Sequence, residues 1–313
     1  MKGELVMAEY ISKLEELLEK GEFVVCSEMG PPVGADPDFI REKCEDLKGY
    51  VDAVNITDNQ TAIIRMSSIA AARIAMEEGL EMIIQVTGRD RNRLGIQSDL
   101  LGASALGLRN VLCLTGDHQC FGNDEGAKNV FDLDSVSIIK SCELMVEKGK
   151  LLNGEELKST KPKLFYGGAH NPFADPFELH MKKMEKKIEA GMKFIQTQCI
   201  YNLEKFDYWM KEVRKRGLHK KCHIIAGILP TRSVKALRMM KKFVAGMDVP
   251  DYTIERMESA EDKKAEGVAM AVDIINHVKD IEGVRGIHLM PVAWEEITPV
   301  VVEKANLYPR PEV

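Results

Sequence analysis

The chain has 313 residues, of which 45% are hydrophobic and 29% are charged, so it is long enough for one large domain or two smaller ones. Its net charge of -6 and pI near 5.8 argue against binding to nucleic acid or to an anionic membrane surface. No apolar run approaches the roughly 18 residues of a membrane-spanning helix. We therefore expect no nucleic-acid partner and no membrane segment.

Residues 1–22 alternate charge with apolar residues at helical spacing and show no signal-peptide core, which predicts a cytoplasmic location. The seven cysteines are scattered without a Cys-x-x-Cys pair. This argues against a disulfide framework, a zinc site or an iron–sulfur cluster carried by this chain alone. We expect Cys26, Cys113, Cys199 and Cys222, in or beside strand-like runs, to pack as buried small hydrophobes.

In chain order, residues 8–20 predict an amphipathic helix with Ile11, Leu14, Leu17 and Leu18 on one face. Short apolar runs then alternate with amphipathic stretches, many of which end at a glycine. The expected strands are 23–28, 51–57, 81–87, 110–117, 163–171, 193–198, 223–229 and 286–290. The expected helices are 36–47, 61–78, 91–106, 134–148, 176–190, 203–216, 233–243 and 260–279, with an extra element at 247–255.

Eight strands, each beside a helix of suitable length, predict an α/β fold, a (β/α)8 TIM barrel with an extra N-terminal helix. We expect a single domain over residues 1–313. A doubly wound open sheet is the second possibility, but it usually carries a glycine-rich phosphate turn after strand one, and Gly30-Pro31-Pro32 stands there instead. The loop 118–131 is long for a strand-to-helix connection, which indicates a functional role.

Glu28 stands at the carboxyl end of the first expected strand, where α/β folds place their chemistry. Pro31 and Pro32 cannot donate to a sheet ladder, so this strand has to stop by Gly30. From position alone, Glu28 is either a functional carboxylate or an ordinary loop glutamate.

Polar side chains follow the other strands and would face a common pocket at the barrel mouth. This mouth has few cations and suits a polar, flat heterocycle bound by hydrogen bonds, although Arg232 could meet an anionic group. Besides Glu28, the strand-end residues are Asn55, Thr57, Asp58, Asn59, Gln85, Thr87, Thr115, Asp117, His118, His170, Asn171, Gln196, Gln198, Gly227, Leu229 and Pro230.

Two carboxylates at this mouth, Glu28 and Asp117, would come from strands one and four on opposite sides. Titratable groups in unlike environments often divide acid and electrostatic roles. The alternative is that one of them caps a helix or pairs with a loop lysine. Gly116, just before Asp117, would let a ligand approach the backbone closely.

The sequence predicts no metal site and no cysteine nucleophile. Cys26 and Cys199 have no catalytic motif around them, so core packing is the favoured interpretation. No metal-ligand spacing relates His118, His170, Asp175 and His180.

The strand ends together resemble those of the methylenetetrahydrofolate reductase family over roughly residues 10–300. The motifs, in family order and spacing, are SEMGPP (27–32), VNITDN (54–59), QVTGRDR (85–91), VLCLTGD (111–117), IQTQ (195–198) and AGILP (226–230). The resemblance implies a barrel that holds a flavin, FAD or FMN, at its mouth. It implies hydride transfer from reduced flavin to 5,10-methylenetetrahydrofolate, which gives 5-methyltetrahydrofolate.

By this resemblance, Glu28 falls on the general acid that protonates the folate ring. Asp117 falls on the aspartate whose charge stabilises the developing cation, and Gln198 on a glutamine that contacts folate. Flavin-contacting positions of the family fall on Thr57, Asp58, Thr115, Gly116, Asn171, Asp175 and Lys187. To these expected cofactor contacts we add the strand-end residues Gln85, Thr87, Asp117 and His118.

The chain departs from the enterobacterial form of the family at several of these places. Gln85 replaces a histidine, Asn171 and Asp175 replace a tyrosine and a histidine, and Val234 replaces an aromatic residue near the last motif. These departures leave open whether the flavin is FAD or FMN. The chain looks closer to the anaerobe (acetogen) type, in which a separate subunit accompanies the flavin barrel.

The resemblance leaves two electron donors open, NAD(P)H or a partner subunit that carries iron–sulfur or zinc centres. It implies an oligomer or a hetero-complex. Two other functions also stay open: a flavin-free pterin-binding barrel of the methyltransferase kind, and a non-catalytic or electron-relay subunit of a larger reductase complex.

Overall fold

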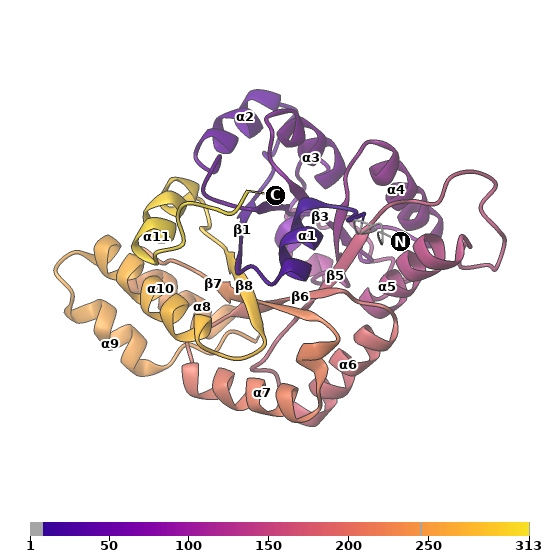
Figure 1. Ribbon diagram of the computed structural model, residues 1–313. Helices are drawn as coiled ribbons and strands as arrows, with labels where there is room; N and C mark the ends of the chain where they lie inside the picture. The colour runs from indigo at the N-terminus through magenta and orange to yellow at the C-terminus, as the bar shows by residue number, and fades with distance from the viewer. Residues whose placement is uncertain (1–8, 245, 313) are drawn as a thin grey trace, which may run out of the picture.

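Eight parallel strands close into a barrel, with each strand hydrogen-bonded to its neighbours in sequence order and β8 to β1 (Figure 1). The computed structural model describes residues 9–244 and 246–312. The strands are β1 (Val24–Met29), β2 (Ala53–Ile56), β3 (Met82–Thr87), β4 (Asn110–Leu114), β5 (Phe165–His170), β6 (Phe194–Cys199), β7 (His223–Ile228) and β8 (Val284–Leu289). The predicted (β/α)8 barrel is confirmed, and β1 stops before Gly30, as the two prolines require.

Helices surround this barrel in a ring, except α1, which lies across one end of it (Figure 1). They are α1 (Lys13–Lys20), α2 (Pro37–Glu45), α3 (Ser68–Glu77), α4 (Arg93–Ala105), α5 (Ser135–Glu143), α6 (Phe177–Glu189), α7 (Leu203–Lys215), α8 (Val234–Phe243), α9 (Asp251–Ser259), α10 (Lys263–Lys279) and α11 (Thr298–Lys304). Short helical turns are η1 (Gln60–Ala62), η2 (Gln119–Phe121), η3 (Leu144–Lys148), η4 (Leu218–Lys220) and η5 (Glu295–Ile297).

Two helix predictions need correction. The helix expected over 61–78 begins only at Ser68, where the Ser67 hydroxyl accepts a hydrogen bond from the Ala70 amide. Thr61 and Ala62 have φ of +54° and +59°, a left-handed conformation that cannot belong to a right-handed helix. The segment α11 was not expected, and the extra element after α8 forms a helix that starts at Asp251 rather than 247.

The extra N-terminal helix is confirmed, but it begins at Lys13 because Ser12 caps it, and residue 8 lies outside the described residues. In Figure 1, α1 lies across the centre of the ring of strands. Its Leu14, Leu17 and Leu18 are fully or almost fully buried. They pack with side chains from inside the barrel, namely Val24, Cys26, Ala53, Ile83, Leu112, Phe165, Phe194 and Ile225. This apolar plug closes the amino-terminal end of the barrel.

A polar pair inside the barrel lies farther along the strands. Asn55 on β2 and Gln196 on β6 exchange two amide hydrogen bonds, of 2.6 and 3.0 Å, and both side chains are buried. Because each amide satisfies the other, the pair tolerates burial. It separates the apolar plug from the strand ends above it.

The last described residues return to the start of β1. The Arg310 guanidinium contacts the buried Asp52 carboxylate at 2.6 Å and donates to the Phe23 carbonyl at 2.7 Å. The same carboxylate accepts the Val25 amide at 2.7 Å. Within residues 9–244 and 246–312, no helix combines the length and apolar character needed to cross a membrane.

Candidate active site

A cavity of about 280 Å³ lies at the carboxyl ends of β2 to β5. Seven of the residues predicted to take part in catalysis or cofactor binding line it: Asp58, Gln85, Thr87, Thr115, Gly116, Asp117 and Lys187. Asn59, Gln60, Thr61, Arg89, Cys113, Leu114, Ser135, Ala169 and Lys183 complete the lining. The structure thus gathers strand-end residues far apart in the sequence around one concave surface.

Glu28 lies at the edge of this cavity, with 13% of its side chain exposed. Gln85 Nε2 donates to its Oε2 at 3.2 Å, and Gln60 Nε2 to its Oε1 at 3.5 Å. Both glutamines line the cavity. The cavity-lining side chains that hydrogen-bond to Glu28 are therefore neutral amides and not a lysine or an arginine.

His288, on β8, is the residue next to Glu28 that the sequence analysis missed. Its Nε2 lies 3.5 Å from Glu28 Oε2, and its buried Nδ1 has no partner among the described residues. In the register of β1 and β8, His288 pairs with Cys26, two residues before Glu28. The sequence did contain a signal for His288, because residues 286, 288 and 290 lie on the same face of the last expected strand.

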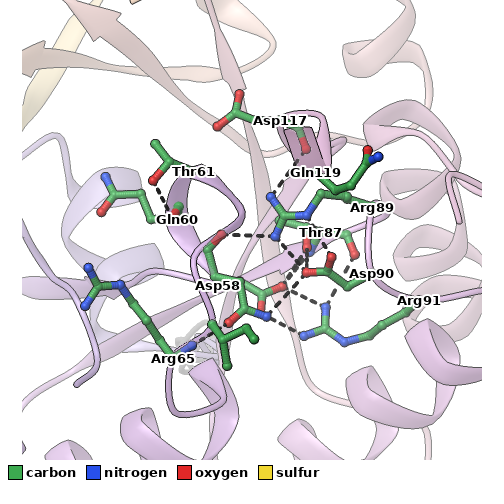
Figure 2. Close-up of polar contacts among 12 residues, drawn as sticks. Asp58, Gln60, Thr61, Arg65, Thr87, Arg89, Asp90, Arg91, Asp117 and Gln119 are labelled. Carbon is green, nitrogen blue, oxygen red and sulfur yellow. Dashed lines mark hydrogen bonds and ion pairs between the residues drawn. The ribbon is translucent and has the colours of Figure 1, made fainter. Parts of the chain in front are cut away.

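The Asp58 carboxylate is fully engaged at the junction of β2 and β3. Its two oxygens receive Arg91 Nη1 and Nη2 at 2.7 and 2.8 Å, and Oδ2 also accepts the Thr87 amide and hydroxyl, each at 2.9 Å. Figure 2 shows Arg91 and Thr87 close to Asp58. Asp58 thus anchors the two strand ends as well as lining the cavity.

Arg89 ties together the loops that follow β2 and β4. Its side chain is 2% exposed, and its Nε and Nη2 each donate a hydrogen bond of 2.7 Å to the Asp90 carboxylate. Its remaining donors reach the carbonyls of Asn59, at 3.0 Å, and Asp117, at 3.4 Å (Figure 2). Burial alone would raise the pKa of Asp90, but the bond from Arg89 and its charge hold that pKa below its usual value.

Gly116 is required where the loop after β4 turns over the cavity. Its φ is +91°, and a Cβ there would lie 2.9 Å from Arg89 Cβ and 3.3 Å from Thr87 Cβ. The turn leaves Asp117 exposed at the rim. In Figure 2 its carboxylate points away from Arg89, while its carbonyl faces that guanidinium.

Lys187, on α6, forms the cationic end of the cavity together with Lys183. Lys187 is buried and donates to the Ala169 carbonyl at 2.5 Å. Burial, and then the positive charge of Lys183, lower the pKa of Lys187 from 10.5 to about 8. An anionic group bound here would favour the charged form and raise this pKa.

The other predicted residues do not line the cavity. Thr57 is buried with its hydroxyl unpartnered among the described residues, and Asp175 is exposed. His118 Nδ1 accepts the Cys120 amide at 3.3 Å, and Gln198 Oε1 the Cys199 amide at 2.9 Å. Asn171 donates to the Gly246 carbonyl at 3.0 Å. Their roles toward a ligand stay predictions.

The cysteine prediction of buried packing is confirmed for Cys26, Cys113, Cys199 and Cys222. Burial raises the pKa of the Cys26 and Cys199 thiols well above the ordinary value, which disfavours the nucleophilic thiolate. Among the described residues, no three or more His, Cys, Asp or Glu side chains come together as a metal site would require.

Sequence comparisons identify relatives of this chain. A family model described as methylenetetrahydrofolate reductase matches residues 13–306. A Caenorhabditis elegans protein described as a probable methylenetetrahydrofolate reductase (NADPH) is 24% identical over 79% of this chain and 36% of its own length. Methylenetetrahydrofolate reductase 2 of Schizosaccharomyces pombe is 26% identical over 77% of this chain and 38% of its own. The chain thus spans little more than a third of these relatives.

Comparison with solved structures supports the fold. An uncharacterised protein from Clostridium thermocellum, described as binding two copies of 5-methyl-5,6,7,8-tetrahydrofolic acid, aligns with a TM-score of 0.64 at 17% identity, over 95% of this chain and 99% of that one. A 2,3-dimethylmalate lyase aligns with a TM-score of 0.52 at 11% identity, over 96% of this chain and 85% of the other. Since the family model covers the whole barrel, this chain belongs to the methylenetetrahydrofolate reductase family.

Proposed function

We propose that this chain is a flavin-dependent reductase that converts 5,10-methylenetetrahydrofolate into 5-methyltetrahydrofolate. The observation that carries the proposal is the position of Glu28, a carboxylate held by Gln85 and Gln60 at the edge of the cavity. Family membership supplies the reaction class, and the two folate molecules described for the Clostridium thermocellum protein support the substrate class.

The cavity has the chemistry that a flavin needs. Thr87 and Thr115 supply hydroxyls and Gln85 an amide for the polar edge of a ring, and Gly116 leaves room for a flat group. Lys187 supplies a buried ammonium for a phosphate. A bound, reduced flavin supplies the hydride that the folate one-carbon unit accepts.

Glu28 is the proton donor in this proposal. Protonation of the bridging nitrogen of the folate five-membered ring opens that ring to an iminium cation, which is the hydride acceptor. A carboxyl group within hydrogen-bond reach of the nitrogen can deliver this proton. Gln85 and Gln60 fix both oxygens, and His288 lies against Oε2, so the acid keeps one orientation.

Asp117 is the electrostatic partner in this proposal. The iminium carries a positive charge, and a fixed negative charge at the rim of the cavity stabilises it. Arg89 holds the Asp117 carbonyl and so sets the backbone from which the carboxylate projects. Replacing Asp117 with Asn should therefore slow folate reduction and alter the reduction potential of the flavin. If neither the rate nor the potential changed, Asp117 would be a loop residue without a role in the reaction.

The electron donor and the assembly are further parts of the proposal. The Caenorhabditis elegans relative is described with NADPH, which favours a nicotinamide donor. The family type that the motifs resemble favours a partner subunit with iron–sulfur or zinc centres, and hence a hetero-complex in the cytoplasm. Copurification from the native host separates these two possibilities.

Two measurements on the purified chain test the proposal. Its absorption spectrum should show the visible bands of oxidised flavin, whereas a flavin-free pterin-binding barrel would show none. With a reduced viologen as donor, the isolated chain should reduce 5,10-methylenetetrahydrofolate. A flavin-containing chain without turnover would be an electron-relay or non-catalytic subunit, and the proposed reaction would then be wrong.

A further inference from the structure

The cavity takes up only one side of the barrel mouth. It lies at the carboxyl ends of β2 to β5, and Glu28 of β1 stands at its edge, bonded to the cavity-lining Gln85. On the other side of Glu28, the mouth is formed by the ends of β7 and β8, because β8 pairs with β1 and β7 pairs with β8. Glu28 therefore lies between the cavity and a second sector of the mouth, the β7–β8 sector.

Arg232 is an exposed cation in the β7–β8 sector. It follows β7, and its guanidinium carbon lies 5.4 Å from the ring centroid of Trp294, a buried residue that follows β8. In the part of the chain that the structure describes, Arg232 forms no ion pair with a carboxylate, and Glu295 beside Trp294 pairs with Lys43 at 2.8 Å. A guanidinium stacked on a ring keeps the N–H donors at its edge free for an anion.

The loops that carry these two side chains are held in place by their neighbours. The Met290 amide donates to the Ile228 carbonyl at 2.8 Å, which ties the loop after β8 to the end of β7. The Thr231 carbonyl packs against α10 so closely that a Cβ on Gly267 would lie 1.7 Å from its oxygen. Arg232 thus projects from a backbone whose position is fixed by packing.

Apolar side chains also belong to the β7–β8 sector. Leu229 directly follows β7 and Met290 directly follows β8, and both are partly buried. By strand alternation, Leu229 shares the inward face of Ile225, which packs inside the barrel, and Met290 shares that of His288, which contacts Glu28. The sector therefore combines a carboxyl group, an apolar surface and a guanidinium.

This combination matches the part of the folate substrate that lies beyond its pterin ring. The nitrogen that Glu28 would protonate carries an apolar benzoyl ring, and that ring carries a glutamate whose two carboxyl groups are ionised at neutral pH. A flat apolar ring suits Leu229 and Met290, and a carboxylate is the group that a guanidinium binds through two parallel hydrogen bonds.

We propose that Arg232, stacked on Trp294, binds a carboxylate of the glutamate tail of the folate substrate and makes the site selective for a glutamylated pterin. This inference rests on the proposed function, because it concerns the substrate of that reaction. The glutamate takes no part in hydride transfer, so Arg232 contributes equally to ground-state and transition-state binding. Its loss should therefore raise KM and leave kcat unchanged.

The test compares 5,10-methylenetetrahydrofolate with 5,10-methylenetetrahydropteroate, which has the same pterin and benzoyl groups but lacks the glutamate. The KM of the parent protein should be at least about tenfold lower for the folate. Arg232→Met should raise the folate KM by roughly tenfold, keep kcat and leave the pteroate KM unchanged. Arg232→Lys should give an intermediate folate KM, because an ammonium keeps the charge but loses the planar fork.

The matched control is Arg238→Met, at an exposed arginine of α8 that pairs with Glu258, and both KM values should stay at the parental level. Calorimetric titration with tetrahydrofolate and tetrahydropteroate repeats the comparison without turnover. Arg232→Met should weaken tetrahydrofolate binding alone.

The outcomes separate the inference from the proposed function. Equal KM values for folate and pteroate, in a parent protein that reduces both, would overturn the inference and leave the proposed function intact. Equal rises of both KM values in Arg232→Met would also overturn it, because the guanidinium would not act on the glutamate. If neither substrate were reduced, the proposed function would fail, and the calorimetric titration would still decide whether Arg232 selects the glutamate tail.

Discussion

The Glu28 carboxylate accepts a hydrogen bond of 3.2 Å from the amide of Gln85, across the mouth of the barrel from β3 to β1. His288 contacts the same oxygen from β8, on the other flank of β1. An acid contacted from both sides, from β3 across β2 and from the adjacent β8, has little orientational freedom to lose, which suits a proton donor to a bound ring.

His288→Asn should lower folate reduction by roughly tenfold, because the Glu28 carboxyl loses one of the polar contacts that orient it. Flavin affinity should stay unchanged, because His288 does not line the cavity. Steady-state assays with a viologen donor, together with flavin titration, check this. Full activity in the variant would mean that Glu28 is positioned by the glutamines alone.

Lys187 predicts a pH-dependent stability of the flavin-free protein. Its pKa is about 8 when folded against 10.5 as the ordinary value, so between these pH values the unfolded chain binds more protons and stability rises with pH. Below pH 8 the full penalty, about 3 kcal/mol, is present. The Lys187→Met variant lacks this penalty. The stability of the variant relative to the parent protein should therefore fall as the pH rises from 8 to 10.5. Urea unfolding at several pH values measures this difference, and parallel pH curves for the two proteins would refute the prediction.

Gly116→Ala should destabilise the protein by about 2 kcal/mol or more, since a Cβ would collide with Arg89 and the backbone has positive φ. It should also weaken flavin binding. Gly102→Ala is the matched control: Gly102 is exposed in α4 with no atom within 4 Å of an added Cβ. That change should stabilise by about 0.5–1 kcal/mol, through helix propensity. Equal effects of the two substitutions would contradict the steric account.

The barrel could be predicted from the sequence because each strand is a short apolar run and glycines end the helices between them. The mistaken helix at 61–78 has a physical cause. Thr61 and Ala62 adopt positive φ in a loop whose fold depends on contacts with the distant loop after β4, where Asn123 accepts the Ile64 amide at 3.1 Å. Local propensity carries no information about such a contact.

The site was predictable in its strand-end residues and less so in its supporting contacts. Gln85, Thr87 and Asp117 line one cavity, together with Lys187 of α6, which only the family resemblance had indicated. Arg89 and His288 were missed as supporting residues, because their importance lies in partners 28 to 260 positions away, Asp117 and Glu28. Asn171 follows a strand as expected, but its partner Gly246 comes from a segment whose path over β5 the sequence pattern does not reveal.

The central claim, that Glu28 is the acid of folate reduction, is tested most directly by comparing Glu28→Gln with Glu22→Gln, a control at an exposed glutamate. The measurement is the rate of methylenetetrahydrofolate reduction by pre-reduced enzyme, beside flavin content and flavin reduction by an artificial donor. Glu28→Gln should retain flavin binding and flavin reduction but lose about two to four orders of magnitude in folate reduction, while the control keeps all three. Folate reduction at the parental rate in Glu28→Gln would contradict the account.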